Sequence, residues 1–434
     1  SQGLAVGTFE DDSPRTPYTD LRSVQPGTML TISLRGDRLA SEVTRWYDLS
    51  ERVAEQVDGL AGATPAAAAD RVRELLANAV AIRLRSDVPV GVSLSGGVDS
   101  SAVAALAASA SGGVTGLTFG HPTVPESEAA LVGLLARSAP ITVHHVWPEP
   151  EAMGGLFWNC LRAQQAPFAS SSVVAQFAVF QRARQEGLTV MLGGQGGDEG
   201  FMGYRKYHLF RLQAALSDRR PREALMAANG LFRALWGERT QASVYWTRGR
   251  QYATGVGPDS ALRLGRVPQP EMGLPPTGGA RARQALDITR WSLPTLLRYE
   301  DRNSMGHSIE SRLPLMDYRL LELGVALPEA LKLRRGYGKW VLRHAVDPIL
   351  PPAITWARAK RGFDVNAGPW MAGGLGHAIR EALQGVLPRV RGLVRPGLRV
   401  PDYFHDARLA GDRAVFADAV ALLWLGGWAA PREG

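Results

Sequence analysis

Residues 88–110 read VPVGVSLSGGVDSSAVAALAASA and contain the pattern that decides the fold. A short apolar run ends in two glycines, and a stretch rich in alanine follows it directly. A buried strand that passes through a glycine turn into a helix is the opening unit of a parallel α/β sheet. The backbone N–H groups of such a turn, at the positive end of the next helix, can bind an anion.

The same rhythm continues beyond this unit. The apolar runs GVTGLTFGH, ITVHHVWP and LTVMLGG are separated by helical stretches that include residues 153–166 and 171–186. Short buried strands alternating with helices predict an α/β fold, a doubly wound parallel sheet with ligands at the carboxyl ends of its strands. Beyond about Tyr207 the strand-like runs stop. The remainder predicts helices joined by loops rich in glycine and proline, notably over 253–280.

The first part of the chain has a different pattern. Three prolines precede an alternating stretch that predicts a β-hairpin turning at residues 35–37. A hairpin cannot bury a core of its own, so we expect it to pack against something else. We therefore divide the chain into residues 1–48 and a main domain over 49–434, which comprises an α/β core over 49–207 and a mainly helical part over 208–434.

Composition narrows the class of protein. The chain has 434 residues, 45% hydrophobic and 21% charged, as in globular proteins of two or three domains. Its apolar runs fall short of the roughly 20 residues that span a bilayer, and its first residues lack a signal-peptide pattern. We therefore expect a cytoplasmic enzyme without a membrane partner. The single cysteine, Cys160, excludes internal disulfides and multi-cysteine zinc sites.

The net charge of +8 raises the question of nucleic acid. Arginines supply most of the positive charge, but they are scattered along the chain and their densest clusters are short. This distribution favours a solvated basic surface over a nucleic-acid footprint, and a basic cleft would also suit anionic ATP.

The glycine turn over residues 95–101 has the residue types that a nucleotide site needs. Its serines add hydroxyl donors, and its glycines let phosphates approach the backbone. Asp99 suits a phosphate site when it holds Mg²⁺. No lysine follows the glycines, so the loop is not a Walker A motif. The structural alternative is a plain turn in which Asp99 and Ser100 cap the helix, but the position between strand and helix favours a nucleotide.

A second acidic loop, GGQGGDE over residues 193–199, follows the apolar run TVML. Because parallel strands end at one edge of a sheet, this loop should open beside the first. Asp99 and Asp198 could then share a Mg²⁺ that bridges the phosphates of ATP. The alternative is a surface turn whose acids cap a helix.

The helical half is less informative by local reasoning. Lys339 precedes an apolar helix, and two interpretations stand: a solvated cation at a helix start, or a catalytic charge that stabilises anionic intermediates. Glu310 and Arg312 are interpreted as a structural ion pair.

Four blocks in this order identify a family. SLSGGVDSS, LGGQGGDEGFMGY, YEDRNSMGHSIESRLPLMDYRLLE and GKWVLR with RAKRGF resemble successive signatures of the asparagine synthetases, from Leu49 to about Trp370. The resemblance implies an ATP-pyrophosphatase domain that uses ATP and Mg²⁺ to adenylate a carboxylate, which an amine then attacks. It implies nucleotide binding at Leu94, Ser95, Gly96, Gly97, Asp99, Ser100, Phe119, Gly193 and Gly194, magnesium at Asp99 and Asp198, and catalysis at Lys339, Gln195 and Lys360.

Two departures from the family pattern concern the amine. The family's second loop is GEGxDE, whose glutamate handles the proton of the incoming nitrogen, and here Gln195 takes that place. The family also begins with a glutaminase domain whose first residue is a nucleophilic cysteine. This chain has Ser1, and residues 1–48 resemble only the end of that domain. We expect the glutaminase part to be a separate or removed piece, or the amine to come from elsewhere. Cys160 cannot be the nucleophile and is expected to be a small buried residue.

These features predict an ATP-dependent amidoligase that joins a small-molecule or peptide carboxylate to ammonia or an amine. A specialised cyclase resembling β-lactam synthetases or lasso-peptide cyclases is the alternative, but the 295–318 block keeps the asparagine synthetase form. Enzymes that thiolate tRNA share SGGxDS, yet they usually rely on reactive cysteines. A non-catalytic binding protein would not need Asp99, Asp198 and Lys339. The acyl substrate stays open, as does a homodimeric state.

Overall fold

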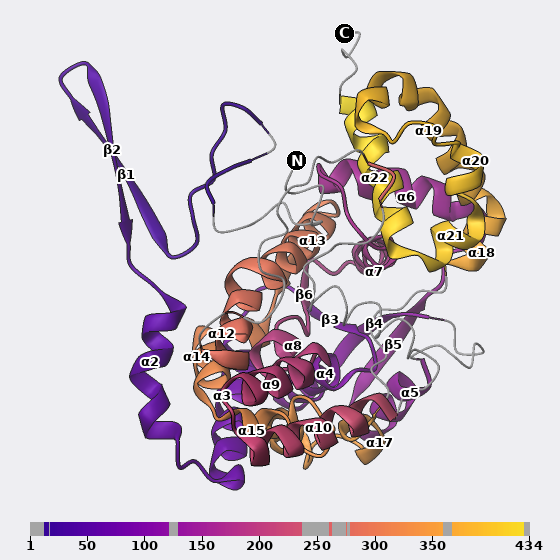
Figure 1. Ribbon diagram of the computed structural model, residues 1–434. Helices are drawn as coiled ribbons and strands as arrows, with labels where there is room; N and C mark the ends of the chain where they lie inside the picture. The colour runs from indigo at the N-terminus through magenta and orange to yellow at the C-terminus, as the bar shows by residue number, and fades with distance from the viewer. Residues whose placement is uncertain are drawn as a thin grey trace.

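The computed structural model describes residues 13–16, 18–120, 129–236, 260–262, 275, 278–358 and 367–428. Within them lies a sheet of five strands, all paired in parallel, in the order β5-β4-β3-β6-β7 (Figure 1). The strands are β3 (Val90–Leu94), β4 (Val114–Phe119), β5 (Ile141–Val146), β6 (Val190–Leu192) and β7 (Glu310–Arg312).

The order of the strands locates a ligand crevice. The chain starts at β3, moves outward to β4 and β5, and then returns to the other side of β3 to form β6 and β7. The direction of winding therefore reverses between β3 and β6, and open α/β sheets bind ligands outside the carboxyl ends of the strands at such a point. The predicted fold class, a doubly wound parallel sheet followed by a mostly helical region, is confirmed.

One strand corrects the sequence prediction. Residues 310–312 lie beyond Tyr207, where we expected only helices and loops, yet they pair with β6. The Glu310 N–H donates to the Thr189 carbonyl at 2.8 Å. Three residues at a sheet edge are too few to show an alternating pattern, so the strand depends on its neighbour rather than on its own sequence. The predicted Glu310–Arg312 ion pair is present at 2.8 Å.

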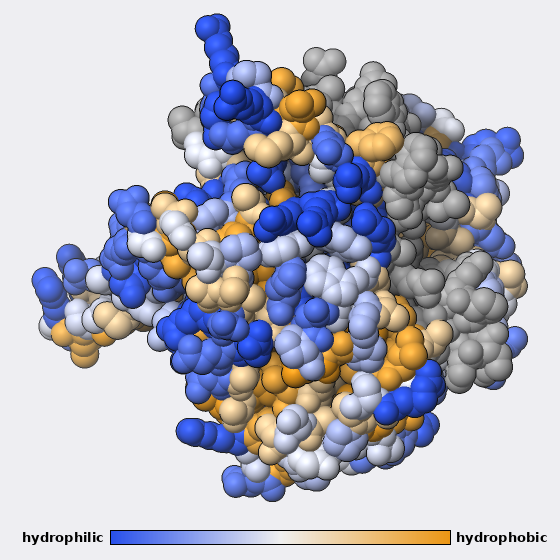
Figure 2. Space-filling view, turned by 90° about the horizontal axis from the view of Figure 1, so that it is seen from below, coloured by the Kyte–Doolittle hydropathy of each residue, from blue (hydrophilic) through white to orange (hydrophobic). Residues whose placement is uncertain are grey.

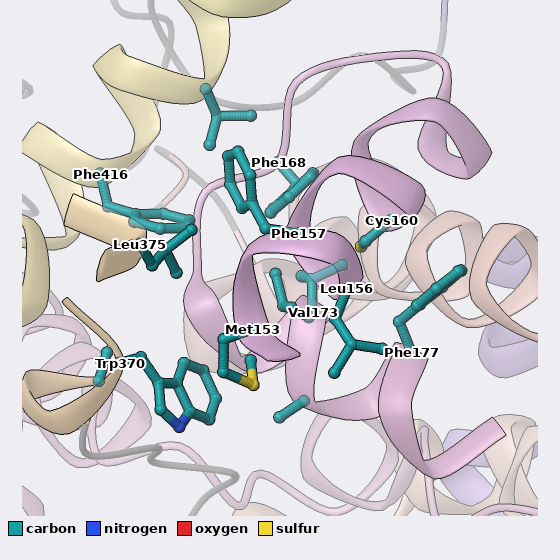
Figure 3. Packing of buried hydrophobic residues seen from close by; sticks show 14 of the residues in the cluster. Met153, Leu156, Phe157, Cys160, Phe168, Val173, Phe177, Trp370, Leu375 and Phe416 are labelled. Carbon is teal, nitrogen blue, oxygen red and sulfur yellow. The ribbon is translucent and has the colours of Figure 1, made fainter. Parts of the chain in front are cut away.

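Helices cover both faces of the sheet. The helices α3 (Pro65–Arg83), α4 (Val98–Ser111) and α5 (Ala129–Ser138) share a hydrophobic cluster with Leu94 and Leu192. The helices α6 (Met153–Gln164) and α7 (Ser171–Gln185) share another with Phe119 and Met191. Met191 and Leu192 are successive residues on opposite faces, as the pleat of a strand requires. Cys160 is buried in the second cluster, as expected (Figure 3).

The rest of the described chain is largely helical. A C-terminal group of helices packs on α6, where Trp370 and Phe416 join the cluster drawn in Figure 3. Among the described helices, none is both long and apolar enough to cross a membrane. The remaining helices are α2 (Leu49–Leu60), α8 (Gly197–Gly200), α9 (Lys206–Ser217), α10 (Pro221–Trp236), α12 (Gly279–Leu286), α13 (Leu293–Met305), α14 (Tyr318–Ala326), α15 (Glu329–Lys332), α16 (Trp340–Val346), α17 (Pro352–Thr355), α18 (Gly368–Trp370), α19 (Gly376–Val390), α20 (Val400–Tyr403), α21 (Asp406–Gly411) and α22 (Arg413–Trp428).

The predicted hairpin is present as β1 (Thr28–Arg35) and β2 (Arg38–Arg45). Arg35 pairs with Arg38, so Gly36 and Asp37 form the tip. The hairpin extends away from the rest of the molecule (Figure 1). Five aliphatic side chains on one of its faces are 39–76% exposed, namely Leu30, Ile32, Leu34, Leu39 and Val43. The hairpin therefore leaves an apolar face uncovered.

Candidate active site

The first loop joins β3 to α4 through residues 95–97. Gly96 has φ +67°, a left-handed conformation that favours glycine. The Ser100 hydroxyl accepts a hydrogen bond from the Ser95 N–H at 3.1 Å and donates to the Gly97 carbonyl at 3.3 Å. The loop thus folds over the N-terminus of a 14-residue helix. Free N–H groups and the helix dipole favour an anion at that end.

The second loop, which follows β6, lies directly against the first. A Cβ atom on Gly194 would lie 2.7 Å from the Ser100 nitrogen, and one on Gly197 would lie 2.6 Å from the Asp99 carboxylate. Real Cβ atoms do not approach other atoms so closely, so both positions need glycine. The two loops open at the same edge of the sheet, where the order of the strands reverses.

Lys339 joins the two loops at the point where they meet. Its Nζ lies 2.5 Å from Oδ2 of Asp99 and 2.7 Å from Oδ1 of Asp198. Its backbone has φ +53°, a strained conformation for a residue other than glycine, and its N–H donates to the Phe201 carbonyl at 3.1 Å. Gly203 leaves room for this contact, because a Cβ there would lie 2.0 Å from the Asp198 oxygen.

The surroundings of Lys339 hold its charge in place. The side chain is only 7% exposed, which does not fit a solvated helix-start cation. Burial lowers the pKa of Lys339, but the carboxylates of Asp198 and Asp99 outweigh burial and hold that pKa above its usual value. The ammonium is therefore a fixed positive charge between two carboxylates.

The same two carboxylates suit a magnesium ion. Mg²⁺ prefers oxygen ligands and usually takes one or two protein carboxylates, with phosphate oxygens and water completing its shell. Asp99 and Asp198 already meet around one cation. Within the described part of the chain, no three histidine, cysteine or acidic side chains form a metal cluster. The donor set therefore fits a cation shared with a nucleotide rather than an all-protein metal cage.

Gln195 leads to a buried acid that sequence reasoning missed. Glu300, on α13, is 4% exposed and accepts hydrogen bonds from the side chains of Gln195, Gln176 and Ser311, the last at 2.8 Å. Burial raises the pKa of Glu300, and these hydrogen bonds oppose the shift. A signal existed in the sequence: Glu300 is three residues before Asn303, on the buried face of an amphipathic helix.

The remaining expected residues divide into two groups. Leu94, at the end of β3, and Gly193, at the start of the second loop, lie beside the switch point. Phe119 ends the neighbouring strand β4, and its ring lies 5.7 Å from Trp147 and 5.6 Å from Trp370 between centroids. Lys360 lies outside the described residues.

A parallel sheet of this strand order, with a glycine–serine loop, paired carboxylates and a buried lysine at its switch point, defines a nucleotide-binding domain of the ATP-pyrophosphatase type. Residues 71–408 match the family model described as asparagine synthase. Since this match covers well over half of the chain, the protein belongs to the asparagine synthase family.

Individual relatives share about a quarter of their residues with this chain. A Mycobacterium tuberculosis protein named "Putative asparagine synthetase (glutamine-hydrolyzing)" is 28% identical over 83% of this chain and 57% of its own length. Asparagine synthetase (glutamine-hydrolyzing) 1 of Bacillus subtilis is 25% identical over 86% and 60%. Amidase chry2 of Gibberella zeae is 26% identical over 71% and 54%. The chain thus spans little more than half the length of these relatives.

Proposed function

We propose that this protein is an ATP-dependent amidoligase, which adenylates a substrate carboxylate, releases pyrophosphate and joins the acyl group to ammonia or an amine. The observation that carries the proposal is the meeting of Asp99, Asp198 and Lys339 at the switch point of the sheet. A site that combines a phosphate loop with carboxylates and a buried cation suits chemistry on a nucleotide phosphate. Membership of the asparagine synthase family supports the same reaction class.

The residues divide the first half-reaction between them. The backbone of residues 95–97 and the serine hydroxyls would bind the phosphates, and Phe119 would border the adenine. When bound, Mg²⁺ held by Asp99 and Asp198 would neutralise the phosphate charge as pyrophosphate leaves. Lys339 would then turn from the carboxylates to the phosphate of the acyl-adenylate and to the oxyanion that forms as the amine attacks.

Glu300 is our candidate for the residue that takes the amine's proton. A glutamine amide is a poor base, so Gln195 cannot replace a glutamate in that role. The Glu300 carboxylate lies immediately behind Gln195 and is within hydrogen-bond reach of its side chain. A buried carboxylate without a lysine or arginine among its hydrogen-bond partners here, Gln176, Ser311 and Gln195, has a raised pKa suited to general-base work.

Residues 1–48 fit the proposal as the end of a glutaminase domain, with 49–434 forming the ligase part. The exposed aliphatic face of β1 and β2 would then pack against the rest of that domain, carried on the same longer polypeptide or on a separate chain. This division is supported by the projecting hairpin and by relatives that are nearly twice as long as the matched region.

The decisive experiment is ATP–pyrophosphate exchange across a panel of carboxylic acids, with aspartate first. We expect exchange that depends on Mg²⁺ and on one acid, with AMP and pyrophosphate as products once an amine is added. Formation of ADP and phosphate instead would reject the adenylation step. An Asp99→Asn variant should lose most of the exchange while its circular dichroism spectrum stays unchanged.

A further inference from the structure

A second buried lysine lies outside the site described above. Lys332, the last residue of α15, is fully buried, and its Nζ donates to three carbonyl oxygens: Gln284 Oε1 at 2.8 Å, Gly324 at 2.8 Å and Val325 at 3.1 Å. Burying an ammonium is costly unless its donors are satisfied. Three acceptors match its three N–H donors, so the position is built for an ammonium.

Two of these acceptors belong to the end of a helix. Gly324 and Val325 lie in the last turn of α14, where the carbonyl groups lack intrahelical partners and the helix dipole is negative. The Lys332 ammonium is therefore the cap of α14 and holds its C-terminus in place.

The third acceptor passes the restraint on to the active site. Because an ammonium only donates, the Gln284 oxygen must face Lys332 and its NH₂ must point the other way. That NH₂ donates to the carbonyls of Glu199 at 2.9 Å and Gly200 at 2.6 Å. Both carbonyls belong to α8, the short helix that carries Asp198.

The capped helix α14 presses on α8 as well. A Cβ on Gly324 would lie 2.4 Å from the Gly200 carbonyl oxygen, so the two backbones are in direct contact. The α8 helix is thus held by the Gln284 amide and by α14, and Lys332 is bonded to both. The Asp198 carboxylate is at the far end of this chain of contacts, 2.7 Å from Lys339.

We propose that Lys332 and Gln284 are positioning residues, which hold α8 so that the Asp198 carboxylate stays opposite Asp99. Neither side chain touches the proposed reactants. The link between Lys332 and α8 is a statement about the fold, while its consequence for Mg–ATP binding rests on the proposed function. Partners that orient metal ligands from behind commonly change metal affinity by about 10–100-fold when they are lost.

The test uses Lys332→Met, which keeps the length of the side chain and removes its three donors. Hydrogen exchange followed by mass spectrometry should show faster exchange in the peptide over 197–203, where the amides of Gly200, Phe201 and Gly203 bond within the loop. Calorimetry with Mg²⁺ and α,β-methylene-ATP should show at least tenfold weaker binding. Gln284→Met should act in the same direction on both measurements.

The matched control is Leu331→Ala, a buried neighbour whose side chain lies in the hydrophobic core instead. It should lower the melting temperature at least as much as Lys332→Met yet leave exchange in 197–203 and nucleotide affinity close to wild type. Equal changes in Leu331→Ala, or wild-type values in Lys332→Met, would overturn the proposal. If Lys332→Met does not fold, Gln284→Met gives the same test, because it leaves the two backbone acceptors of Lys332 in place.

A further outcome separates this inference from the proposed function. If the wild-type protein binds no Mg–nucleotide but exchange in 197–203 still responds to Lys332→Met, the link between Lys332 and α8 stands and the ligase proposal fails. If the wild type binds the nucleotide and exchange is the same in all variants, the reverse holds.

Discussion

Lys339 shows how one residue can combine strain, burial and charge. Its left-handed backbone costs about 1–2 kcal/mol, and its buried ammonium adds a desolvation cost. Contacts with Asp99 and Asp198 offset both costs. Strain that is held by its surroundings is typical of functional positions.

The first prediction concerns this residue. Lys339→Met should slow amide formation by about 2–4 kcal/mol of transition-state stabilisation, the effect of losing one oxyanion-type donor. Affinity for Mg–ATP should stay the same or improve, because the ammonium no longer competes for the carboxylates. Single-turnover kinetics and calorimetry measure the two effects separately.

The control for this variant is Arg335→Met. Arg335 is an exposed cation four residues away and also has a positive φ, so it matches Lys339 in charge and backbone but not in burial. Near-normal turnover in Lys339→Met would return that lysine to a purely structural role.

The second prediction concerns Glu300. Burial raises its pKa above the usual 4.5, so the rate of amide formation should fall as the pH drops through a value higher than that. Glu300→Gln should lose this acidic limb and about 10²–10⁴-fold in rate, while pyrophosphate exchange persists. Glu310→Gln, an exposed acid paired with Arg312, should leave the pH profile unchanged. An acidic limb that survives in Glu300→Gln would assign the base to another group.

At the scale of elements, α9 and α10 pack over a buried histidine. His208 is 4% exposed and lies near Gly230 of α10. Burial lowers its pKa to about 4, and Arg211 and Arg205 add to the shift. The histidine is therefore neutral in the folded protein across the physiological pH range.

The third prediction follows from the sign of this shift. The folded pKa is below the unfolded value of about 6.5, so this stabilisation is complete above pH 6.5 and is lost as the pH falls toward 4. The full loss is about 3 kcal/mol. Thermal unfolding of His208→Gln should depend less on pH over this window than that of the wild type, whereas His377→Gln, at an exposed position, should follow the wild type. Identical pH dependence in all three would contradict it.

At the scale of the whole molecule, the hairpin stands apart from the ligase core. Its base is anchored, since the Tyr47 hydroxyl donates to Glu322 on α14 at 3.0 Å. Its tip and its aliphatic face are exposed. An apolar sheet face of this kind normally meets a partner.

The fourth prediction follows at this scale. Glutamine hydrolysis in this family needs a terminal cysteine on a complete glutaminase scaffold, so the purified chain should release no glutamate from glutamine. Ammonium or an added amine should support turnover where glutamine does not. Glutamate release at a rate that matches amide formation would refute this prediction.

Local patterns determined much of the architecture. Strands β3 to β6, the helices between them and the hairpin were predictable, because hydrophobic periodicity and glycine turns are properties of neighbouring residues. The motif over residues 95–101 indicated a nucleotide loop for the same reason. The assignments of ligand roles, including that of Lys360, remain predictions.

Only the tertiary structure decided how the distant parts meet. Lys339 is 240 residues from Asp99, and nothing in its local sequence distinguishes a solvated cation from one buried between two carboxylates. β7 needed β6 as its template, and Glu300 looked like an ordinary helical acid until α13 packed against the second loop. These features depend on long-range packing, which fixes burial and charge neighbours. Periodicity within one element reports only which face is apolar, not what that face will meet.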